Sequence, residues 1–520
     1  MKKSLYKYIE NHAKNNPNDL AIIFEKKKLS YIELLNNINY ISEYISKTLK
    51  AKKGDRIAIL SYNRIEFITL FYACAKLGTI LVPINWRLTS FEITHIIKNV
   101  GAKYLFIESV FNEVSKELLS KILNLIIIGI DFTPSSRKII KTSKKTIAKT
   151  TITKCNADFD SPMLIVYTSG TTGKPKGATL SQKAVYYNIL NSITMHNFNK
   201  LDHILTVIPL FHVGGLNIQT IPALHIGAKV TLHKKFKTKQ IFSALKKNIH
   251  TFTVFVPTIL ETLLQDKNWN PRVFTSLKAI TTGSTIVAAD LIKTYEDNKI
   301  PILQVYGSTE TAPIAICQKI SEKRTPFGNA GKAAQYNKAK IFNKKYQESE
   351  NNIIGEIGIK GSNLFSYYWK DKNKTRKAFV NGWFMTGDYG KKNNNNQFYI
   401  IGRKENIIIS GGENIYPAEL EQTLNKENNI IEAAILGISD TKWQKIPIAF
   451  ITVKNKSSFK ISECIKNLKI KLANYKIPRM FFFIEEIPKN ALGKIDYKVL
   501  REYYENLKLE DKLKENNNDN

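Results

Sequence analysis

Residues 167–178 read Tyr-Thr-Ser-Gly-Thr-Thr-Gly-Lys-Pro-Lys-Gly-Ala, and this stretch indicates the fold and the chemistry of the chain more clearly than any other. Its glycines allow backbone N–H groups to approach an anion closely, and its hydroxyl and ammonium groups can donate to phosphate oxygens. The apolar run 163–167 is typical of a buried strand, and α/β folds place ligands at strand ends. The stretch therefore predicts a phosphate-binding loop, with a solvated turn as the alternative.

The loop is not a Walker loop, because Gly170 and Gly173 lack the four-residue gap and no Ser or Thr follows Lys174. The residues that we expect to contact a nucleotide here are Thr168, Ser169, Gly170, Thr171, Thr172, Gly173, Lys174 and Lys176.

The first ~400 residues alternate short β-branched runs with helical patterns, which predicts parallel sheets covered by helices. The clearest of these runs are 56–60, 104–107, 125–129, 251–256, 277–281 and 302–306. From about Gly402 onward, strands near 407–409, 433–436 and 448–453 and a helix near 416–424 predict a separate α+β unit. The fold class is therefore α/β, with a large N-terminal domain and a smaller α+β domain.

The chain has 520 residues, 43% of them hydrophobic, and a formal net charge of +34. Lysines occur throughout, accompanied by many Asn and Ile residues, and no nucleic-acid recognition module is present, so compositional drift explains the charge best. The same charge allows weak attraction to acidic lipid. The four scattered cysteines and the broken apolar runs predict a cytoplasmic enzyme with free thiols and without a transmembrane segment.

A second motif, Tyr306-Gly-Ser-Thr-Glu310, follows the expected strand at 302–306. An aromatic ring at a strand end can stack on adenine, Thr309 can bond a phosphate oxygen, and Glu310 can hold Mg²⁺. The same residues would also suit a tight turn before a helix, where Ser, Thr and Glu act as caps.

A third motif, Pro488-Lys-Asn-Ala-Leu-Gly-Lys494, places Lys494 after a glycine on a loop. A long cationic side chain there can reach into a cleft and stabilise charge on a carboxylate and a phosphate. In so lysine-rich a chain, a plain surface lysine is the alternative.

These motifs, in this order, resemble those of the acyl/aryl-CoA synthetase, luciferase and peptide-synthetase adenylation superfamily. The resemblance implies ATP, Mg²⁺ and coenzyme A, and a small C-terminal domain that moves. We therefore expect an N-terminal AMP-binding domain at 1–401, a C-terminal one at 402–510 with a hinge near 403–405, and a disordered polar tail at 511–520.

The resemblance also implies roles residue by residue. Catalytic roles fall to Thr309, Glu310 and Lys494, and the metal falls to Glu310. Nucleotide contacts outside the loop are implied for Gly283, Tyr306, Gly307, Thr309, Asp388, Arg403 and Lys494. His212, Val213, Gly214 and Gly283 are implied for the acyl pocket, and Ser410, Gly411 and Gly412 for CoA.

The sequence departs from the family pattern in two places. Glu405 stands at the implied hinge, where relatives usually have Asp or Lys, and Asn406 stands where Asp is common. Tyr367 replaces the glycine that often precedes Tyr-Trp, so local packing there is expected to differ.

The resemblance implies an ATP-dependent acid–CoA ligase that acts as a monomer or homodimer. Apolar stretches at 211–216 and 256–260, without a cationic residue to pair a second carboxylate, favour a medium- or long-chain fatty acid. The alternatives are an o-succinylbenzoate–CoA ligase or another aryl or short-chain acid–CoA ligase. A carrier-protein adenylation module, a luciferase-type oxygenase and a basic nucleic-acid-binding protein are further, less favoured hypotheses.

Overall fold

The computed structural model describes residues 4–131, 157–168, 175–285, 287–322, 329–410, 413–441, 443–490 and 493–518, with side chains through residue 508. The chain forms two compact units. The first consists of 1–284, 289–340 and 358–386, and the second of 285–288, 341–357 and 387–520. The domain bounds expected from the sequence, 1–401 and 402–510, stay a prediction.

An antiparallel pair of strands explains why residues 387–401 belong to the second compact unit. Strand β20 (Trp383–Lys392) pairs with β21 (Phe398–Arg403) from Asp388↔Arg403 to Lys392↔Phe398. Because these backbone hydrogen bonds tie 387–392 to 398–403, the two segments belong to one unit. The expected hinge at 403–405 therefore lies inside the second unit and stays a prediction.

The larger sheet of the first unit contains six parallel strands: β13, β12, β11, β9, β10 and β1. Antiparallel strands flank them, β14 and β15 beyond β13 and β2 beyond β1. Their bounds, along the sheet, are β15 Asn329–Ala333, β14 Ile316–Cys317, β13 Ile302–Tyr306, β12 Ala279–Gly283, β11 Phe252–Val254, β9 His203–Thr206, β10 Lys229–Leu232, β1 Leu20–Phe24 and β2 Lys27–Ser30. The parallel strands all present their carboxyl ends at one edge of the sheet.

The second sheet of the first unit has seven strands in the order β18, β8, β7, β4, β3, β5, β6. Strands β7, β4, β3, β5 and β6 are parallel, whereas β8 is antiparallel to both β7 and β18. The bounds are β18 Tyr367–Tyr368, β8 Lys176–Ser181, β7 Pro162–Thr168, β4 Ile80–Pro83, β3 Arg56–Leu60, β5 Tyr104–Ile107 and β6 Ile126–Gly129. The predicted strands of the N-terminal region are confirmed.

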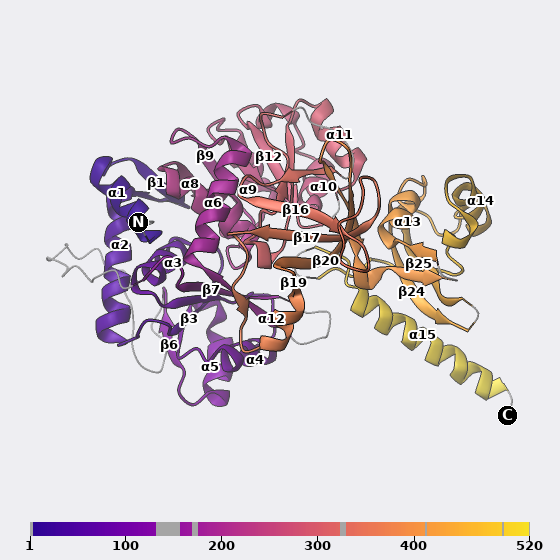
Figure 1. Cartoon of the computed structure of the whole chain (residues 1–520), viewed down its shortest axis with the longest axis horizontal. Coiled ribbons are helices and arrows are strands. Elements are labelled where there is room, and N and C mark those ends of the chain that lie inside the picture. The colour runs from indigo at the N-terminus through magenta and orange to yellow at the C-terminus, as the bar shows by residue number, and fades with distance from the viewer. Residues whose placement is uncertain are drawn as a thin grey trace. The chain divides into compact units, whose positions relative to one another are not determined.

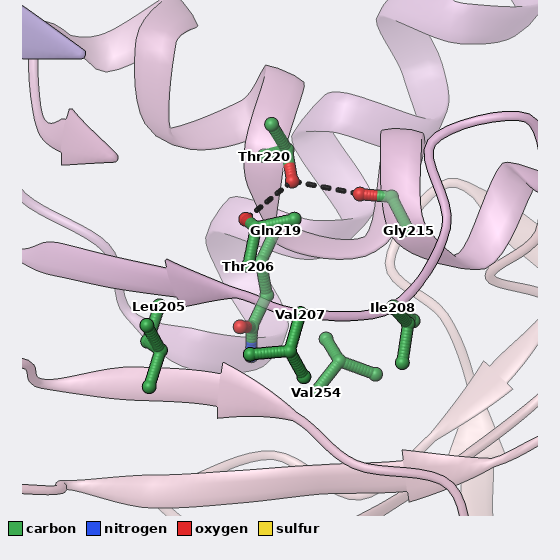
Figure 2. Close-up of a pocket in the computed structure, with 8 residues that line it drawn as sticks. All are labelled: Leu205, Thr206, Val207, Ile208, Gly215, Gln219, Thr220 and Val254. Carbon is green, nitrogen blue, oxygen red and sulfur yellow. Dashed lines mark hydrogen bonds between the residues drawn. The ribbon is translucent and has the colours of Figure 1, made fainter. Parts of the chain in front are cut away.

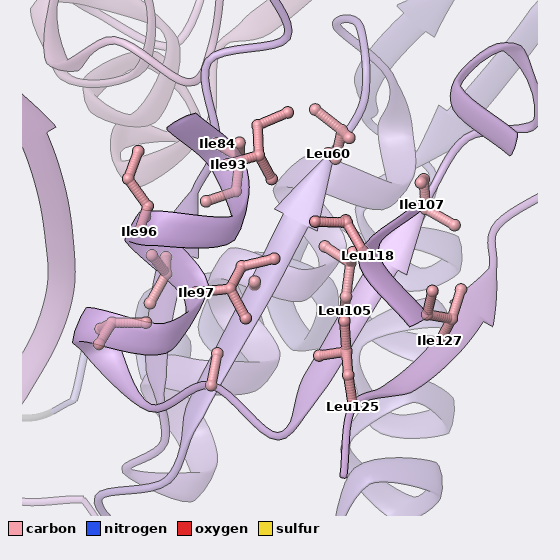
Figure 3. Close-up of a cluster of buried hydrophobic side chains, with 14 of the residues drawn as sticks. Leu60, Ile84, Ile93, Ile96, Ile97, Leu105, Ile107, Leu118, Leu125 and Ile127 are labelled. Carbon is pink, nitrogen blue, oxygen red and sulfur yellow. The ribbon is translucent and has the colours of Figure 1, made fainter. Parts of the chain in front are cut away.

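Helices α4 (Ser90–Val100) and α5 (Asn112–Lys121) cover one face of this second sheet (Figure 1, Figure 3). Helix α4 begins at a capping box formed by Thr89 and Glu92 and ends at Gly101, whose φ of +67° suits a left-handed helix cap. Its residues at 93, 96, 97 and 100 follow the helical period and are buried against the strands.

The other helical elements of the first unit complete its layers. Their bounds are α1 Tyr6–Asn15, α2 Tyr31–Glu43, η1 Tyr44–Thr48, α3 Ile65–Leu77, η2 Ser109–Phe111, α6 Gln182–His196, α7 Val213–Gly215, η3 Leu216–Thr220, α8 Ile221–Ile226, α9 Thr238–Leu245, α10 Pro257–Gln265, η4 Pro271–Phe274, α11 Ala289–Asp297, η5 Thr309–Thr311 and α12 Lys372–Ala378, beside the short strand β19 Phe379–Val380. No helix in the described ranges is long and apolar enough to cross a membrane.

The second unit contains an antiparallel sheet with the order β23, β22, β25, β24, and β26 adds to β25 in parallel. Helices α13 and α14 pack on it around Leu420, Leu424 and Leu468. Strands β16 and β17, like β20, have residues in both units. The bounds of the remaining elements are β16 Asn337–Phe342, β17 Gly355–Gly361, η6 Lys404–Asn406, β22 Ile408–Ser410, β23 Glu413–Ile415, α13 Pro417–Leu424, β24 Ile430–Asp440, β25 Gln444–Val453, α14 Ile461–Lys471, η7 Asn474–Lys476, β26 Phe481–Phe483 and α15 Tyr497–Asn518.

Helix α15 differs from the expectation of a disordered tail at 511–520, because its backbone continues through Asn518. The segment 505–515 consists largely of Glu, Lys and Leu, which have high intrinsic helix propensity.

Candidate active site

The predicted phosphate loop joins two antiparallel strands, β7 and β8, and Thr168 pairs with Lys176 at its base. The Thr168 hydroxyl is buried and makes no hydrogen bond within the described part of the chain. An unpaired buried hydroxyl is unusual and suits a polar ligand. The remaining residues predicted for this loop, Ser169, Gly170, Thr171, Thr172, Gly173 and Lys174, lie outside the described residues.

Lys176, Tyr368 and Glu310 form a cluster at the base of this loop. The Tyr368 hydroxyl donates to Glu310 Oε1 at 2.7 Å, and Lys176 Nζ donates to the Tyr368 hydroxyl oxygen at 3.1 Å. Lys176 Nζ also lies 3.7 Å from Glu310 Oε1 and 4.5 Å from the centroid of the Tyr368 ring. The Lys176 ammonium group and the buried Glu310 carboxylate thus both form a hydrogen bond with the Tyr368 hydroxyl.

Strand pairing explains how these three residues meet. In β18, Tyr368 lies opposite Ala178 of β8, and Lys176 is two residues before Ala178, so it shares that face of the strand. Glu310 belongs to the 3₁₀ turn η5, and its backbone carbonyl accepts a hydrogen bond from the Phe365 N–H at 2.8 Å.

Tyr368 is a site residue that the sequence analysis missed. The Tyr-Tyr-Trp segment at 367–369 had been assessed only as a packing variation at Tyr367. The signal that could have found it is the alternation of β18, which puts Tyr367 and Tyr368 on opposite faces.

Glu310 is only 6% exposed and Thr309 likewise, so both stand in a site largely shielded from solvent. Carboxylate oxygens are ligands that Mg²⁺ prefers, and Mg²⁺ commonly uses one or two carboxylates together with substrate phosphates. In the described ranges no group of three or more His, Cys, Asp or Glu side chains is placed to hold a metal. The residues present therefore fit a magnesium ion carried largely by a nucleotide.

Tyr306 and Gly283 lie at the carboxyl ends of neighbouring strands, β13 and β12, where Gly283 pairs with Val305. A Cβ atom on Gly283 would collide with the Val305 carbonyl oxygen, and one on Gly307 would collide with the Pro313 carbonyl oxygen. Both glycines are thus required by close backbone approach, and Tyr306, which precedes Gly307 in the chain, is half-buried.

His212, Val213 and Gly214 begin helix α7. The His212 Nδ1 atom accepts a hydrogen bond from the Gly214 N–H at 3.0 Å, so the imidazole caps the helix. Val213 is buried, and the close contact of Gly214 with the His212 ring leaves no room for a side chain there. His212 therefore has a structural role in addition to the predicted one in the acyl pocket.

A small, tightly packed pocket lies just after this segment, between η3 and the ends of β9 and β11, and its lining leaves no room for a water-sized sphere (Figure 2). Its lining consists of Leu205, Thr206, Val207, Ile208, Gly215, Gln219, Thr220 and Val254. The lining combines aliphatic side chains with the polar side chains of Thr206, Gln219 and Thr220, and Figure 2 shows Gln219 extending from η3 towards the strand segment that carries Leu205 and Val207.

In the second unit, Asp388 and Arg403 lie opposite each other in the β20–β21 pair, and Arg403 Nε donates to Asp388 Oδ1 at 2.9 Å. Asp388 is buried, whereas the Arg403 side chain is 45% exposed. A carboxylate held by strand pairing can accept hydrogen bonds from ribose hydroxyls.

Glu405, the expected hinge residue, is exposed in the 3₁₀ turn η6. Its neighbour Lys404 forms an ion pair with Glu356 at 2.8 Å, which raises the pKa of that lysine despite its partial burial. Ser410, predicted for CoA, is buried at the end of β22 opposite Glu413. Gly411 and Gly412 lie outside the described residues.

Lys494 lies half-buried at the end of a hairpin whose strands meet at the Lys489↔Ile495 bridge. The Asn490 N–H donates to the Lys494 carbonyl at 2.8 Å, and the Lys494 N–H donates to Asn490 Oδ1 at 3.2 Å. Gly493 adopts a φ of +76°, a conformation that glycine tolerates best. The structure thus confirms that Lys494 stands on a tight loop, while its catalytic role stays a prediction.

The chain also resembles known proteins over nearly its full length. Indoleacetate–CoA ligase from Aromatoleum aromaticum is 36% identical over 495 residues, which cover 94% of this chain and 96% of that protein. The 2-succinylbenzoate–CoA ligase of Bacillus subtilis is 29% identical, with 94% and 96% covered. A solved structure of the Bacillus subtilis o-succinylbenzoate CoA synthetase, in complex with its acyl-adenylate intermediate, has a TM-score of 0.83 at 30% identity and covers 94% of this chain and 96% of that one.

The fold and these residue groups define an adenylate-forming enzyme. The chain belongs to the AMP-binding enzyme family, whose model matches residues 9–369, and the model of the AMP-binding enzyme C-terminal domain matches residues 419–494. It is an acid–thiol ligase of the AMP-forming acyl-CoA synthetase type, and it uses ATP, Mg²⁺ and CoA.

Proposed function

We propose that this ligase activates a compact aromatic carboxylic acid. In the first step, a carboxylate oxygen of the acid attacks the α-phosphorus of ATP, and pyrophosphate leaves with the electrons of the broken P–O bond. In the second step, the CoA sulfur, having released its proton, attacks the carbonyl carbon of the acyl-adenylate, and AMP leaves. The products are an acyl-CoA thioester, AMP and pyrophosphate.

The main support for the proposed reaction with ATP is the cluster of Lys176, Tyr368 and Glu310. It supplies one cation for phosphate oxygens and one buried carboxylate for a metal, at the base of a loop of the phosphate-binding type. Glu310 would hold Mg²⁺, and the ion would supply positive charge to neutralise the charge that develops on the phosphate oxygens. Because Lys176 lies near the same carboxylate oxygen, we expect it to turn towards the phosphates when Glu310 engages the metal.

The other predicted residues keep proposed roles. Tyr306 stacks on adenine, Asp388 and Arg403 hold the ribose, and Lys494 stabilises charge while the α-phosphorus is attacked. Thr309 donates to a phosphate oxygen. Ser410 with the adjoining glycines contacts CoA, and the chain near Glu405 acts as the hinge between the two steps.

The names of related proteins support an aromatic acid. Relatives of this chain include ligases named for indoleacetate, 2-succinylbenzoate and ferulate. The medium- or long-chain fatty acid that the sequence favoured is the second candidate, supported by the aliphatic side chains of the pocket lining and by a relative named fatty acid–[acyl-carrier-protein] ligase.

A screen of acids distinguishes these candidates. Pyrophosphate release would be measured with ATP, Mg²⁺ and CoA for phenylacetate, indole-3-acetate, 2-succinylbenzoate, octanoate and palmitate, and thioesters would be identified by mass spectrometry. We expect the arylacetates to give the highest kcat/KM. If kcat/KM instead rises steadily with alkyl chain length, by up to about 0.8 kcal/mol of activation free energy per buried methylene, the fatty-acid candidate is correct.

A location in the cytoplasm, a monomeric or homodimeric state and weak contact with acidic membranes remain part of the proposal. A gel-filtration run and a sedimentation assay with anionic vesicles at physiological salt test the last two.

A further inference from the structure

Gln219 lies at the centre of a buried hydrogen-bond network in the first unit. Its Nε2 donates to the Thr253 carbonyl at 3.3 Å and to Thr281 Oγ1 at 3.0 Å. His196 Nε2 lies 2.7 Å from the same Thr281 Oγ1, and His196 Nδ1 lies 2.8 Å from the Ser192 carbonyl. The network therefore connects α6, β12, η3 and β11.

The proton positions in this network follow from its two backbone carbonyls, which can only accept. His196 Nδ1 must carry a proton to bond the Ser192 carbonyl, so its Nε2 accepts from the Thr281 hydroxyl. Burial lowers the His196 pKa to about 4, which agrees with a neutral ring. Thr281 Oγ1 is then free to accept one Gln219 N–H, and the Thr253 carbonyl accepts the other.

This assignment fixes the orientation of the Gln219 amide, because a flipped amide would set its oxygen against the Thr253 carbonyl. The Gln219 side chain is 1% exposed, and its Oε1 has no hydrogen-bond partner within the described part of the chain. A buried amide oxygen without a partner costs roughly 1–3 kcal/mol, so a partner present only in a complex would explain it.

Gln219 lines the pocket at the carboxyl ends of β9 and β11 (Figure 2). The neighbouring strand β12 ends at Gly283, which was predicted to border the acyl group. The other two polar side chains of the lining both have partners: the Thr206 hydroxyl donates to Thr220 Oγ1 at 2.8 Å, and Thr220 donates to the Gly215 carbonyl at 2.7 Å. Among the side chains of the lining, Gln219 Oε1 is therefore the one polar atom without a hydrogen-bond partner within the described residues.

Water does not explain this acceptor, because the lining side chains leave no room for a water-sized sphere. A ligand group reaches Oε1 only when the lining moves apart. The π-helical turn η3, which carries Gln219, is the type of helical irregularity that occurs often at functional sites.

We propose that the acid substrate carries a hydrogen-bond donor, an N–H or O–H, at the end remote from its carboxylate, and that Gln219 Oε1 accepts it. This inference rests on the proposed ligase function. It assigns Gln219 the role of a specificity-determining residue in the acyl pocket.

Paired substrates that differ only in the donor test the inference. Indole-3-acetate would be compared with benzothiophene-3-acetate, and 4-hydroxyphenylacetate with 4-methylphenylacetate, by kcat/KM for thioester formation. We expect the wild-type chain to prefer the donor-bearing member of at least one pair by about 10-fold or more. Equal kcat/KM values within both pairs would overturn the inference while leaving the ligase function intact.

Variants separate recognition from a purely structural role. Gln219→Met keeps the side-chain length without the acceptor, and it should reduce the preference to about one. Thr281→Val removes one partner of Gln219 Nε2 but leaves Oε1, so it should retain the preference even if its overall rate falls. If both variants lower all four rates equally and keep the preference, Gln219 is only structural. If the wild-type chain forms no thioester from any acid, the ligase function itself fails.

Discussion

Tyr368 shows at the scale of single residues what a linear motif leaves out. Lys176 and Glu310 belong to motifs that the sequence analysis identified, but the phenol that joins them depends on the register of β18 against β8. Long-range register is not encoded in residue spacing, and therefore the contact required coordinates. Gly283 and Gly307 were expected, from the resemblance, to contact the nucleotide. The structure shows that a Cβ atom on either would meet a backbone carbonyl oxygen, while their contact with a nucleotide stays a prediction.

Replacing Tyr368 with Phe should lower the rate of ATP–pyrophosphate exchange by roughly 10-fold, since it removes the hydroxyl that bonds both Glu310 and Lys176. The ring is kept, so thermal stability should change little. Tyr367→Phe is the matched control, because Tyr367 is on the opposite face of the same strand. Equal effects of the two substitutions on exchange would argue against a role for the Tyr368 hydroxyl.

Elements were predicted well where a regular hydrophobic pattern defines them. The strands at 56–60, 104–107 and 302–306 have the predicted bounds, and the helix expected at 416–424 spans Pro417–Leu424. The π-helical turn η3 was not anticipated, because an inserted residue in a helix leaves no periodic signal in a short apolar segment. The pocket beside it could not be predicted for the same reason.

The loop that carries Lys494 is anchored by buried contacts at its base. The Tyr497 hydroxyl donates to Glu421 Oε1 at 2.8 Å, and the Ile435 N–H donates to the same oxygen at 2.9 Å. Lys489 also pairs with Glu432 at 2.9 Å. These contacts tie the hairpin and the start of α15 to α13 and β24.

Tyr497→Phe should therefore destabilise the second unit by about 1–2 kcal/mol in urea unfolding, because one acceptor site of the buried Glu421 loses its donor. Tyr504→Phe, on the same helix and packed against Phe482, is the control and should have a smaller effect. A Tyr497→Phe variant as stable as the wild type would contradict the anchoring role.

At the scale of the whole molecule, the family resemblance predicted two domains, with a boundary at 402 that stays a prediction, and the chain forms two compact units. The β20–β21 pair draws 387–401 into the second unit, and the contact between these strands is not visible in a motif that ends at Asp388. The hinge near 403–405 stays a prediction.

Glu405→Pro should leave adenylate formation largely intact and slow thioester formation by about 10-fold or more, because proline fixes φ at the proposed hinge. Glu405 is exposed, and a 3₁₀ turn such as η6 has a typical φ of about −50 to −70°, close to that of proline, so folding should be retained. Single-turnover measurements of both steps provide the check. Unchanged rates for both steps would mean that the hinge lies elsewhere.

The pH dependence of stability should reflect the buried histidines of the first unit. Burial lowers the pKa values of His196, His203 and His233 to about 4, and those of His225 and His250 to about 3. In the unfolded chain the same histidines take up protons at about pH 6.5. The contribution of the neutral, buried histidines to stability is therefore complete above that pH and is lost as the pH falls towards 4.

Glu421 acts in the opposite direction in the second unit, since burial raises its pKa to about 7. The contribution of Glu421 to stability is complete below the pKa that this residue has in the unfolded chain, and it is lost as the pH rises through about 7. Thermal unfolding between pH 5 and 8 should therefore show a first unit whose Tm falls in acid and a second unit whose Tm falls as the pH rises. The second of these two trends should disappear in the Glu421→Gln variant. A Tm for the first unit that stays constant from pH 7 to 5 would contradict the assignment of neutral buried histidines.

The most direct test of the central claim is ATP–pyrophosphate exchange in the presence of indole-3-acetate, measured for the wild-type chain and for Lys494→Ala, with Lys498→Ala as the control on an exposed lysine nearby. We predict exchange that depends on the acid, a loss of roughly 100-fold or more in Lys494→Ala, and little change in Lys498→Ala. We also predict that Lys494→Ala still converts a pre-formed acyl-adenylate and CoA to the thioester. Wild-type exchange that does not depend on any carboxylic acid, or an equal loss of both steps in Lys494→Ala, would contradict the account.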